Sequence, residues 1–210
     1  MSQDPSRTAT VPPVVTVFEQ YSAGADEVGR AVADALGVPF HPQAFTSEDL
    51  EGGTTATEQG AVLAQVYRVL GGAYGGLEGR DVATTQRQRY DLVIANNLAV
   101  WELASPGGVI VGRNGAVVLA QRPRTVHVLL TGSVEDRVGR AARAAGITPE
   151  RAAARQRVED RVRAEMSLAL YGWDPRLPDR YDLVVSTSRI PPELAASTIV
   201  HTVTGAAARA

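Results

Sequence analysis

The stretch VVTVFEQYSAGADEVGRAVADALGVPF, residues 14–40, decides the fold class. It begins with residues 14–18, a short β-branched apolar run that is typical of a buried parallel strand. Apolar residues then recur from Val28 to Leu36 at the spacing of one helical face, and Gly37 ends that pattern. The stretch therefore predicts a strand, a glycine-bearing loop and a helix.

Further apolar runs continue this alternation along the chain. A helical stretch is predicted near residues 117–120, and residues 90–104 fit either a strand or a helix. The helical spacing of Ile94, Leu98 and Trp101 favours the helix for this segment. Alternating strands and helices predict an α/β protein with a parallel sheet. The predicted strands are residues 14–18, 108–112, 126–130 and 182–187.

The composition excludes several classes of function. The chain has 210 residues, a formal net charge of -2 and no cysteine, which excludes thiolate catalysis and zinc sites built on sulfur. All 21 basic residues are arginine, so neither a Schiff base nor the lysine of a standard phosphate-binding P-loop is available. The charge balance predicts no nucleic-acid partner, and the lack of a long apolar run predicts no membrane partner and a cytoplasmic location.

The chain length predicts a single domain over residues 13–204. Residues 1–12 are polar and carry prolines, and we predict a disordered leader there. Two helices are predicted within residues 133–171, because Ser133 with an acid three residues on, and Thr148 before a proline, have the form of helix N-caps.

The loop after the first predicted strand has two interpretations. A strand, a glycine-bearing loop and a helix N-terminus together form a natural anion site. The loop matches a Walker A motif weakly, and Asp26 and Glu27 occupy positions where phosphate charge would lie. In the other interpretation these two acids only stabilise the start of the helix. The candidate loop residues are Ser22, Ala23, Gly24, Ala25, Asp26 and Glu27.

The two predicted helices of residues 133–171 carry the strongest local charge imbalance in the chain. From Arg137 to Arg163 there are eight arginines and three acidic residues, an excess of five positive charges. Such a pair can bind phosphate groups bidentately, or it can be a solvated face whose charges pair within one helix, as Asp160 and Arg163 could. The sequence alone leaves both interpretations open.

Arg113 follows a predicted strand within Gly-Arg-Asn-Gly, at the end of a parallel sheet where ligands gather. The alternative is a turn with one exposed arginine. His41, His127 and His201 are far apart and lack metal-ligand spacing, so no metal site is predicted and His127 is expected to be a core or edge residue. No nucleophile elbow or dinucleotide fingerprint is present, which argues against hydrolases and dehydrogenases.

The order of these motifs resembles the cytidylate kinase-like branch of the P-loop nucleoside monophosphate kinases. The resemblance covers most of the chain and is weakest from about residue 41 to residue 89. It rests on Tyr21, Gly24, Val28-Gly29, Leu36-Gly37-Val38-Pro39-Phe40, Val109-Ile110-Val111-Gly112-Arg113, His127-Val128, Glu135-Asp136-Arg137, Arg140, Asp160, Arg163, Tyr171-Gly172-Trp173, Tyr181-Asp182-Leu183-Val184 and Thr187.

This resemblance implies a P-loop NTPase-type parallel five-stranded sheet flanked by helices, with a helical arginine-rich lid over residues 133–171 and a helical region on the acceptor side over residues 41–107. It also implies transfer of the γ-phosphate of ATP, with Mg²⁺, to a pyrimidine nucleoside monophosphate. In that picture Arg137, Arg140 and Arg163 are catalytic, and Arg113, Asp160 and Arg163 bind the acceptor.

The phosphate loop departs from the family pattern. Ser22 and Ala25 replace glycines, Asp26 replaces a residue that is often basic, and Gln156 stands where the lid usually has an arginine. One carboxylate near a triphosphate costs on the order of a few kcal/mol at an effective dielectric of about 20, enough to abolish useful ATP affinity. A catalytically degenerate pseudokinase that senses nucleotides, or binds a protein partner or a second copy of itself, is therefore the alternative function.

Overall fold

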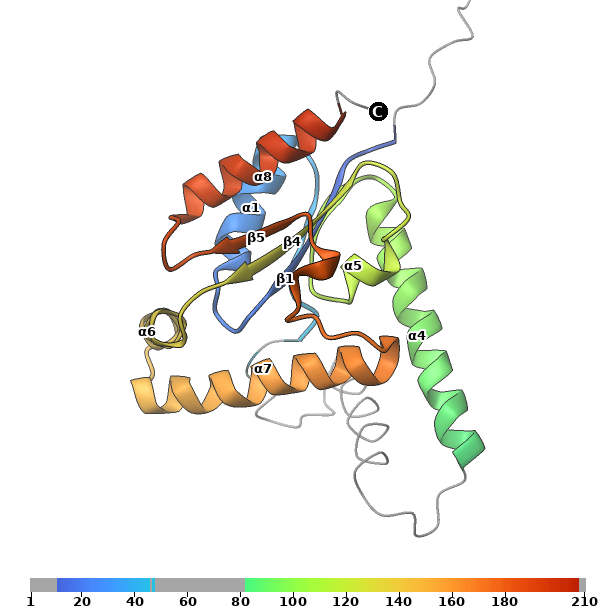
Figure 1. Ribbon diagram of the computed structural model, residues 1–210, viewed down its shortest axis with the longest axis horizontal. Coiled ribbons are helices and arrows are strands. Elements are labelled where there is room, and N and C mark those ends of the chain that lie inside the picture. The colour runs from blue at the N-terminus through green and yellow to red at the C-terminus, as the bar shows by residue number, and fades with distance from the viewer. Residues whose placement is uncertain (1–10, 46, 48–81, 208–210) are drawn as a thin grey trace, which may run out of the picture.

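A computed structural model describes residues 11–45, 47 and 82–207 of the chain (Figure 1). Its centre is a five-stranded parallel sheet in the order β2-β3-β1-β4-β5. The strands are β1 (Val14–Glu19), β2 (Phe40–His41), β3 (Gly108–Val111), β4 (Thr125–Thr131) and β5 (Leu183–Ser186). The parallel α/β architecture predicted from the sequence is confirmed.

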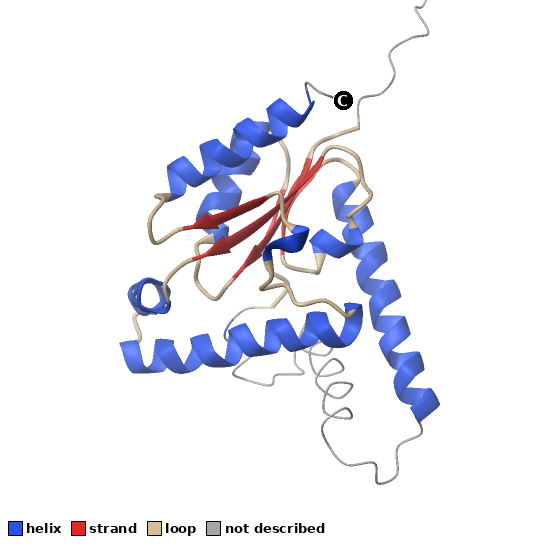
Figure 2. Cartoon of the chain, in the orientation of Figure 1, coloured by secondary structure: helices blue, strands red, loops and turns tan. Residues whose placement is uncertain are grey.

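Helices cover both faces of this sheet (Figure 2). The 90–104 segment, which the sequence left ambiguous, lies within one long helix. The helices are α1 (Ala25–Leu36), α4 (Val82–Ala104), α5 (Gly115–Val118), α6 (Val134–Ala145), α7 (Pro149–Tyr171) and α8 (Pro192–Ala207), with a 3₁₀ turn η1 (Pro178–Arg180) before β5. None of the described helices is both long and apolar enough to span a membrane.

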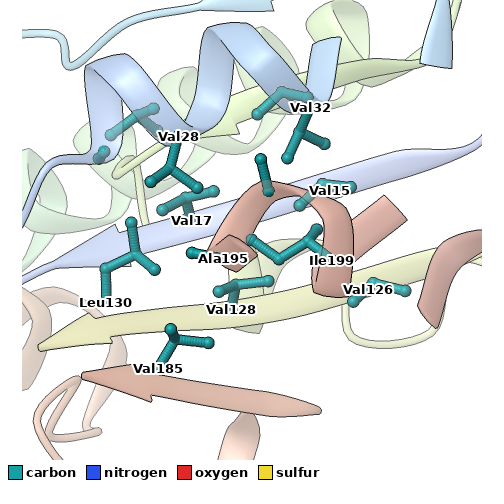
Figure 3. Packing of buried hydrophobic residues seen from close by; sticks show 14 of the residues in the cluster. Val15, Val17, Val28, Val32, Val126, Val128, Leu130, Val185, Ala195 and Ile199 are labelled. Atoms are coloured by element: carbon teal, nitrogen blue, oxygen red, sulfur yellow. The ribbon is translucent and has the colours of Figure 1, made fainter. Parts of the chain in front are cut away.

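The main core lies between the sheet and the helices α1 and α8, and it is aliphatic throughout (Figure 3). Val28 and Val32 of α1 and Ile199 of α8 are completely buried against β1 and β4. A smaller core on the opposite face packs α4 and α5 against β1 and β3, through Val100 and Leu119 among others. Burying these side chains contributes about 1.5–3 kcal/mol each, which explains the continuous apolar runs of the strands.

The strand β2 has only two residues and is not among the four strands that the apolar runs predicted. It is fixed by Phe40, which pairs with Val109 of β3 and packs onto α1. A Cβ atom at Gly29 would lie 2.6 Å from the Phe40 ring, so α1 needs a glycine where it crosses β2. The Val-Gly and Pro-Phe elements of the sequence therefore serve the same contact.

The helices α6 and α7 lie beyond the carboxyl ends of the strands (Figure 1). Their bounds match the two helices predicted within residues 133–171, and the predicted caps are present, since Ser133 and Thr148 each accept a hydrogen bond from a backbone N–H three residues on. Residues 1–10 of the predicted leader, and residues 46 and 48–81 of the predicted acceptor-side region, lie outside the described residues. In the remaining part of that region the structure has His41, the last residue of β2, and the helix α4.

Candidate functional site

The β1–α1 loop is shaped for anions and is filled by two carboxylates of the protein itself. The backbone N–H groups of Gly24 and Ala25 donate to Glu19 Oε2 at 3.1 and 3.0 Å. The N–H of Tyr21 donates to Asp160 Oδ1 at 2.6 Å. Three amides of one short loop thus donate hydrogen bonds to carboxylate oxygens, as expected where a loop leads into a helix N-terminus.

Two positive φ angles give the loop its shape. Gly24 is the N-cap of α1 at φ 93°, and Ser22 lies in the left-handed region at φ 56°. A left-handed conformation costs an L-residue roughly 1–2 kcal/mol that glycine avoids. The serine at residue 22 therefore holds a backbone conformation for which a glycine would be better suited. Ala23 and Ala25 are buried against the sheet.

The side chains of Asp26 and Glu27 do not enter the loop. Asp26 is largely exposed and pairs with Arg30 one turn along α1, at 3.1 Å from Nε to Oδ2. Glu27 is also exposed. The acidic group that meets the loop amides is Glu19, the last residue of β1, which the sequence analysis did not single out. An acid closing an otherwise apolar strand was the signal that could have pointed to it.

The arginines of α6 bind the loop from the other side. Arg137 is almost fully buried and donates to Gly132 O and Tyr21 O, both at 3.1 Å. Arg140 donates to Ser22 O at 2.6 Å, and to Thr187 Oγ1 and O at 3.2 Å. Gly132 directly follows β4 and Thr187 directly follows β5, and the other two acceptors lie just after β1. These two arginines therefore connect the ends of three strands.

Asp160 of α7 contacts both α6 and the loop. Its Oδ2 lies 2.9 Å from Arg137 Nη1 and accepts a hydrogen bond from Gln156 Nε2 at 2.8 Å, while its Oδ1 holds the Tyr21 amide. Gln156, at the position where the lid usually carries an arginine, therefore acts here as a donor to Asp160. Arg137 is almost fully buried, so removing the Asp160 carboxylate would leave an unpaired buried charge and would strongly destabilise the folded protein.

Arg163 of α7 lies between two carboxylates. Its Nη2 donates to Glu159 Oε2 at 2.8 Å, and its Nη1 is 3.9 Å from Glu19 Oε1. The pairing of Arg163 within its own helix is thus with Glu159 instead of Asp160. Glu159 is almost fully buried, and this burial raises the pKa of its carboxyl above the ordinary value, although Arg163 opposes the effect.

A pocket of about 310 Å³ lies between the β1–α1 loop and the helices α6 and α7. It has a polar side and a small-residue side, the latter formed by alanines of α6. Its lining residues are Glu19, Tyr21, Ser22, Ser47, Ala141, Ala144, Ala145, Arg155, Glu159 and Arg163. The pocket therefore adjoins the loop amides and carries both arginine and carboxylate groups.

Arg113 lies at a separate place, after β3. Its Nη2 donates to Pro42 O at 3.3 Å, its carbonyl accepts from Asn96 Nδ2 at 2.9 Å, and burial lowers the pKa of its guanidinium. Within the described residues it has no hydrogen bond or ion pair with Asp160 or Arg163. The structure thus brings Arg137, Arg140, Asp160 and Arg163 together at the loop, and it places Arg113 at the next strand.

The predicted histidine behaviour is confirmed for His127. It is buried in β4, with Nδ1 2.7 Å from Thr16 Oγ1, and burial lowers the pKa of its ring. No group of three or more metal-ligating side chains occurs in the part of the chain that the structure describes. The groups that meet at the β1–α1 loop are backbone amides, arginines and carboxylates.

The sequence model of the cytidylate kinase-like family matches residues 14–189, which include every element from β1 to β5. The chain belongs to the cytidylate kinase-like family. This assignment confirms the resemblance read from the sequence, and the P-loop kinase-like fold that it implied.

The chain is also similar in sequence to one curated relative and in structure to two solved proteins. A uronate isomerase of Corynebacterium glutamicum is 34% identical over 135 residues, which are 59% of this chain and 26% of that protein. The chain thus spans about a quarter of that relative's length. An uncharacterized protein from Eubacterium ventriosum aligns over 91% of this chain and 98% of its own, with a TM-score of 0.60 and 14% identity. A shikimate kinase from Acinetobacter baumannii, in complex with shikimate, aligns over 92% and 94% with a TM-score of 0.48 and 16% identity.

Proposed function

We propose that this cytidylate kinase-like protein binds nucleotide phosphates between the β1–α1 loop and the helices α6 and α7, and transfers the γ-phosphate of ATP to a pyrimidine nucleoside monophosphate. The observation that carries the proposal is the convergence of Arg137, Arg140 and Arg163 on a loop whose amides already bind carboxylates. Phosphoryl transfer is mostly positioning and charge neutralisation, so these groups are the ones it needs.

The residues divide between the two phosphates of the reaction. In this proposal the amides of residues 22–27 and the guanidinium groups of Arg137 and Arg140 hold the ATP phosphates. Arg163, with Asp160 and Arg113, binds the acceptor monophosphate. Arg140 lies beside the loop, since a Cβ atom at Gly24 would be 3.9 Å from its Nη1, so its guanidinium is within reach of a phosphate bound there. The arginines take over the role of the absent lysine.

Mg²⁺ would enter this site bound to ATP. The described residues offer no cluster of carboxylates or histidines that could hold the ion alone, whereas the loop amides and arginines fit phosphate oxygens. Mg²⁺ supplies charge neutralisation between the phosphates when it is bound. The residues of the chain bind and orient the phosphates and exclude water from around them.

The proposal is tested by incubating the protein with Mg-ATP and each of a panel of ribo- and deoxynucleoside monophosphates. Formation of the nucleoside diphosphate is measured. Arg140→Gln is the variant of choice, because the acceptors of Arg140 are carbonyl and hydroxyl oxygens and no carboxylate is left unpaired. Arg143→Gln, an exposed arginine of the same helix, is the matched control. We expect turnover with one monophosphate that falls at least a hundredfold in Arg140→Gln and is retained in Arg143→Gln. Equal turnover in both variants would identify a contaminating kinase.

A catalytically degenerate pseudokinase is the second candidate, and the position of Glu19 favours it. The carboxylate that accepts from Gly24 and Ala25 occupies donors that a triphosphate would need, in a chain that has no lysine. Such a protein would bind a nucleotide, a protein partner or a second copy of itself without transfer. Nucleotide binding in calorimetry, together with no turnover of any monophosphate at millimolar ATP, would support this candidate over the kinase.

A further inference from the structure

Glu19 has a place in the phosphate loop that family membership does not explain. Its side chain is mostly buried, Oε2 bridges the amides of Gly24 and Ala25, and Oε1 faces Arg163 at 3.9 Å. Two N–H donors on one oxygen form the geometry in which a loop of this kind binds a phosphate oxygen. The carboxylate therefore occupies the position of a ligand.

The Glu19 carboxylate also has a second possible partner, Arg163. Arg163 is paired with Glu159 through Nη2, and its Nη1 is directed at Glu19 from beyond ordinary hydrogen-bond distance. A small rotation of the Glu19 side chain would exchange the two amides for a closer contact with this guanidinium. Glu19 would then leave the loop without losing a partner for its charge.

We propose that Glu19 is an internal stand-in for a ligand phosphate and determines which anions the loop accepts. A phosphate enters by displacing the Glu19 carboxylate from the Gly24 and Ala25 amides towards Arg163. A ligand must therefore carry enough charge to compete with a carboxylate that is covalently held beside the loop, which favours polyphosphates over monoanions. This inference rests on the proposed phosphate site, but it does not depend on phosphotransfer.

Glu19→Gln tests the proposal, since it keeps the size of the side chain and removes its charge. The matched control is Asp34→Asn, which removes an equal charge from an exposed side chain near the end of α1, outside the proposed phosphate site. Binding of inorganic tripolyphosphate and of ATP is measured by calorimetry for the wild type and both variants. We expect at least a tenfold gain in tripolyphosphate affinity in Glu19→Gln and a change below threefold in Asp34→Asn.

Two outcomes would overturn the inference: an unchanged or weaker affinity in Glu19→Gln, or an equal gain in both variants, which would show a general charge effect. Tripolyphosphate separates this inference from the proposed function. A gain for tripolyphosphate without kinase turnover keeps the role of Glu19 and rejects the transfer reaction. If the wild type shows turnover but Glu19→Gln does not bind ATP more tightly, the reaction is supported and the role of Glu19 is rejected.

A spectroscopic test uses the wild-type chain and does not need a stable variant. During a tripolyphosphate titration, the amide resonances of Gly24 and Ala25 and the side-chain carboxyl carbon of Glu19 are followed together. We expect all three to shift with the same midpoint, because the amides exchange one oxygen for another as the carboxylate leaves. Amides that shift while the Glu19 carbon stays constant, or no shift at millimolar tripolyphosphate, would contradict displacement.

Discussion

The β1–α1 and β3–α5 junctions are built alike and held differently. Both leave neighbouring strands of the sheet at the carboxyl end, and both pass through left-handed residues into a helix. At the first junction, charged side chains meet the backbone, as Glu19, Asp160 and Arg137 do. At the second, Asn96 binds the Arg113 carbonyl and Asn114 accepts from the Trp173 indole, so that except for Arg113 the groups are neutral.

This difference shows that the strand–loop–helix geometry alone does not make an anion site. The second junction leads into α5, a helix of only four residues. The Asn96 amide donates to the Arg113 carbonyl there, and the Trp173 indole donates to the Asn114 side chain. The first junction leads into a twelve-residue helix and is surrounded by arginines of α6 and α7. Apart from Glu19 of β1, these charges come from α6 and α7, which are far from the loop in the sequence. The following predictions test this comparison.

Asp160→Asn is expected to have the largest effect, because it breaks the ionic junction at its centre. The variant keeps the size of the side chain but leaves the buried Arg137 without its carboxylate, and we expect a loss of about 3 kcal/mol in the free energy of unfolding. Urea unfolding measures it. Asp26→Asn, which breaks an exposed pair, should cost below about 0.5 kcal/mol. Equal losses in both variants would show that burial does not distinguish the two pairs.

Gly115→Ala is the corresponding change at the neutral junction, where packing instead of charge is decisive. An added Cβ atom would lie 2.9 Å from Thr16 Cγ2 in β1, and such overpacking costs about 1–3 kcal/mol. Gly205→Ala is the control, since a Cβ atom there meets nothing within 4 Å and a helical alanine is favourable. Thermal unfolding compares the two variants. No loss in Gly115→Ala would mean that α5 moves freely away from β1.

These two variants also separate what the sequence could predict from what it could not. Strands, helices and caps follow from local patterns, so the fold, the loop around Gly24 and the basic helix pair were all visible. Glu19 was not, because its partners are backbone amides of a loop whose conformation the sequence does not state. Asp160 was predicted to bind the acceptor, which stays a prediction. Its contacts with Tyr21 and Arg137 could not be predicted, because they form only when α7 is folded over the loop.

Glu159 makes the ionic junction sensitive to pH. Because burial raises the pKa of its carboxyl in the folded chain, the folded state binds this proton more tightly than the unfolded state does. Its contribution to stability is therefore present at low pH and is lost as pH rises from about 4.5 through the raised pKa, at about 1.4 kcal/mol for each pH unit in that window.

Comparison of the wild type with Glu159→Gln isolates this contribution. The difference in free energy of unfolding, wild type minus variant, should fall as pH rises from 4.5 towards neutrality, and urea titrations at several pH values measure it. Glu150→Gln, a change at an exposed carboxylate in the first turn of the same helix, reports the background. A difference that rises with pH would show that Arg163 outweighs burial at this position.

Tyr171→Phe is expected to have the smallest effect and gives the sharpest test of independence. It removes the hydroxyl that accepts from Asn96 and donates to Asn97, which should cost about 1 kcal/mol, while Tyr90→Phe on the exposed face of α4 should cost almost nothing. Because Tyr171 holds only neutral groups, tripolyphosphate affinity should stay within twofold of the wild type. If tripolyphosphate affinity falls more than this in Tyr171→Phe, while the free energy of unfolding changes only as expected, the two junctions bind phosphate as one site. The contrast between a charged and a neutral junction would then describe two halves of a single pocket.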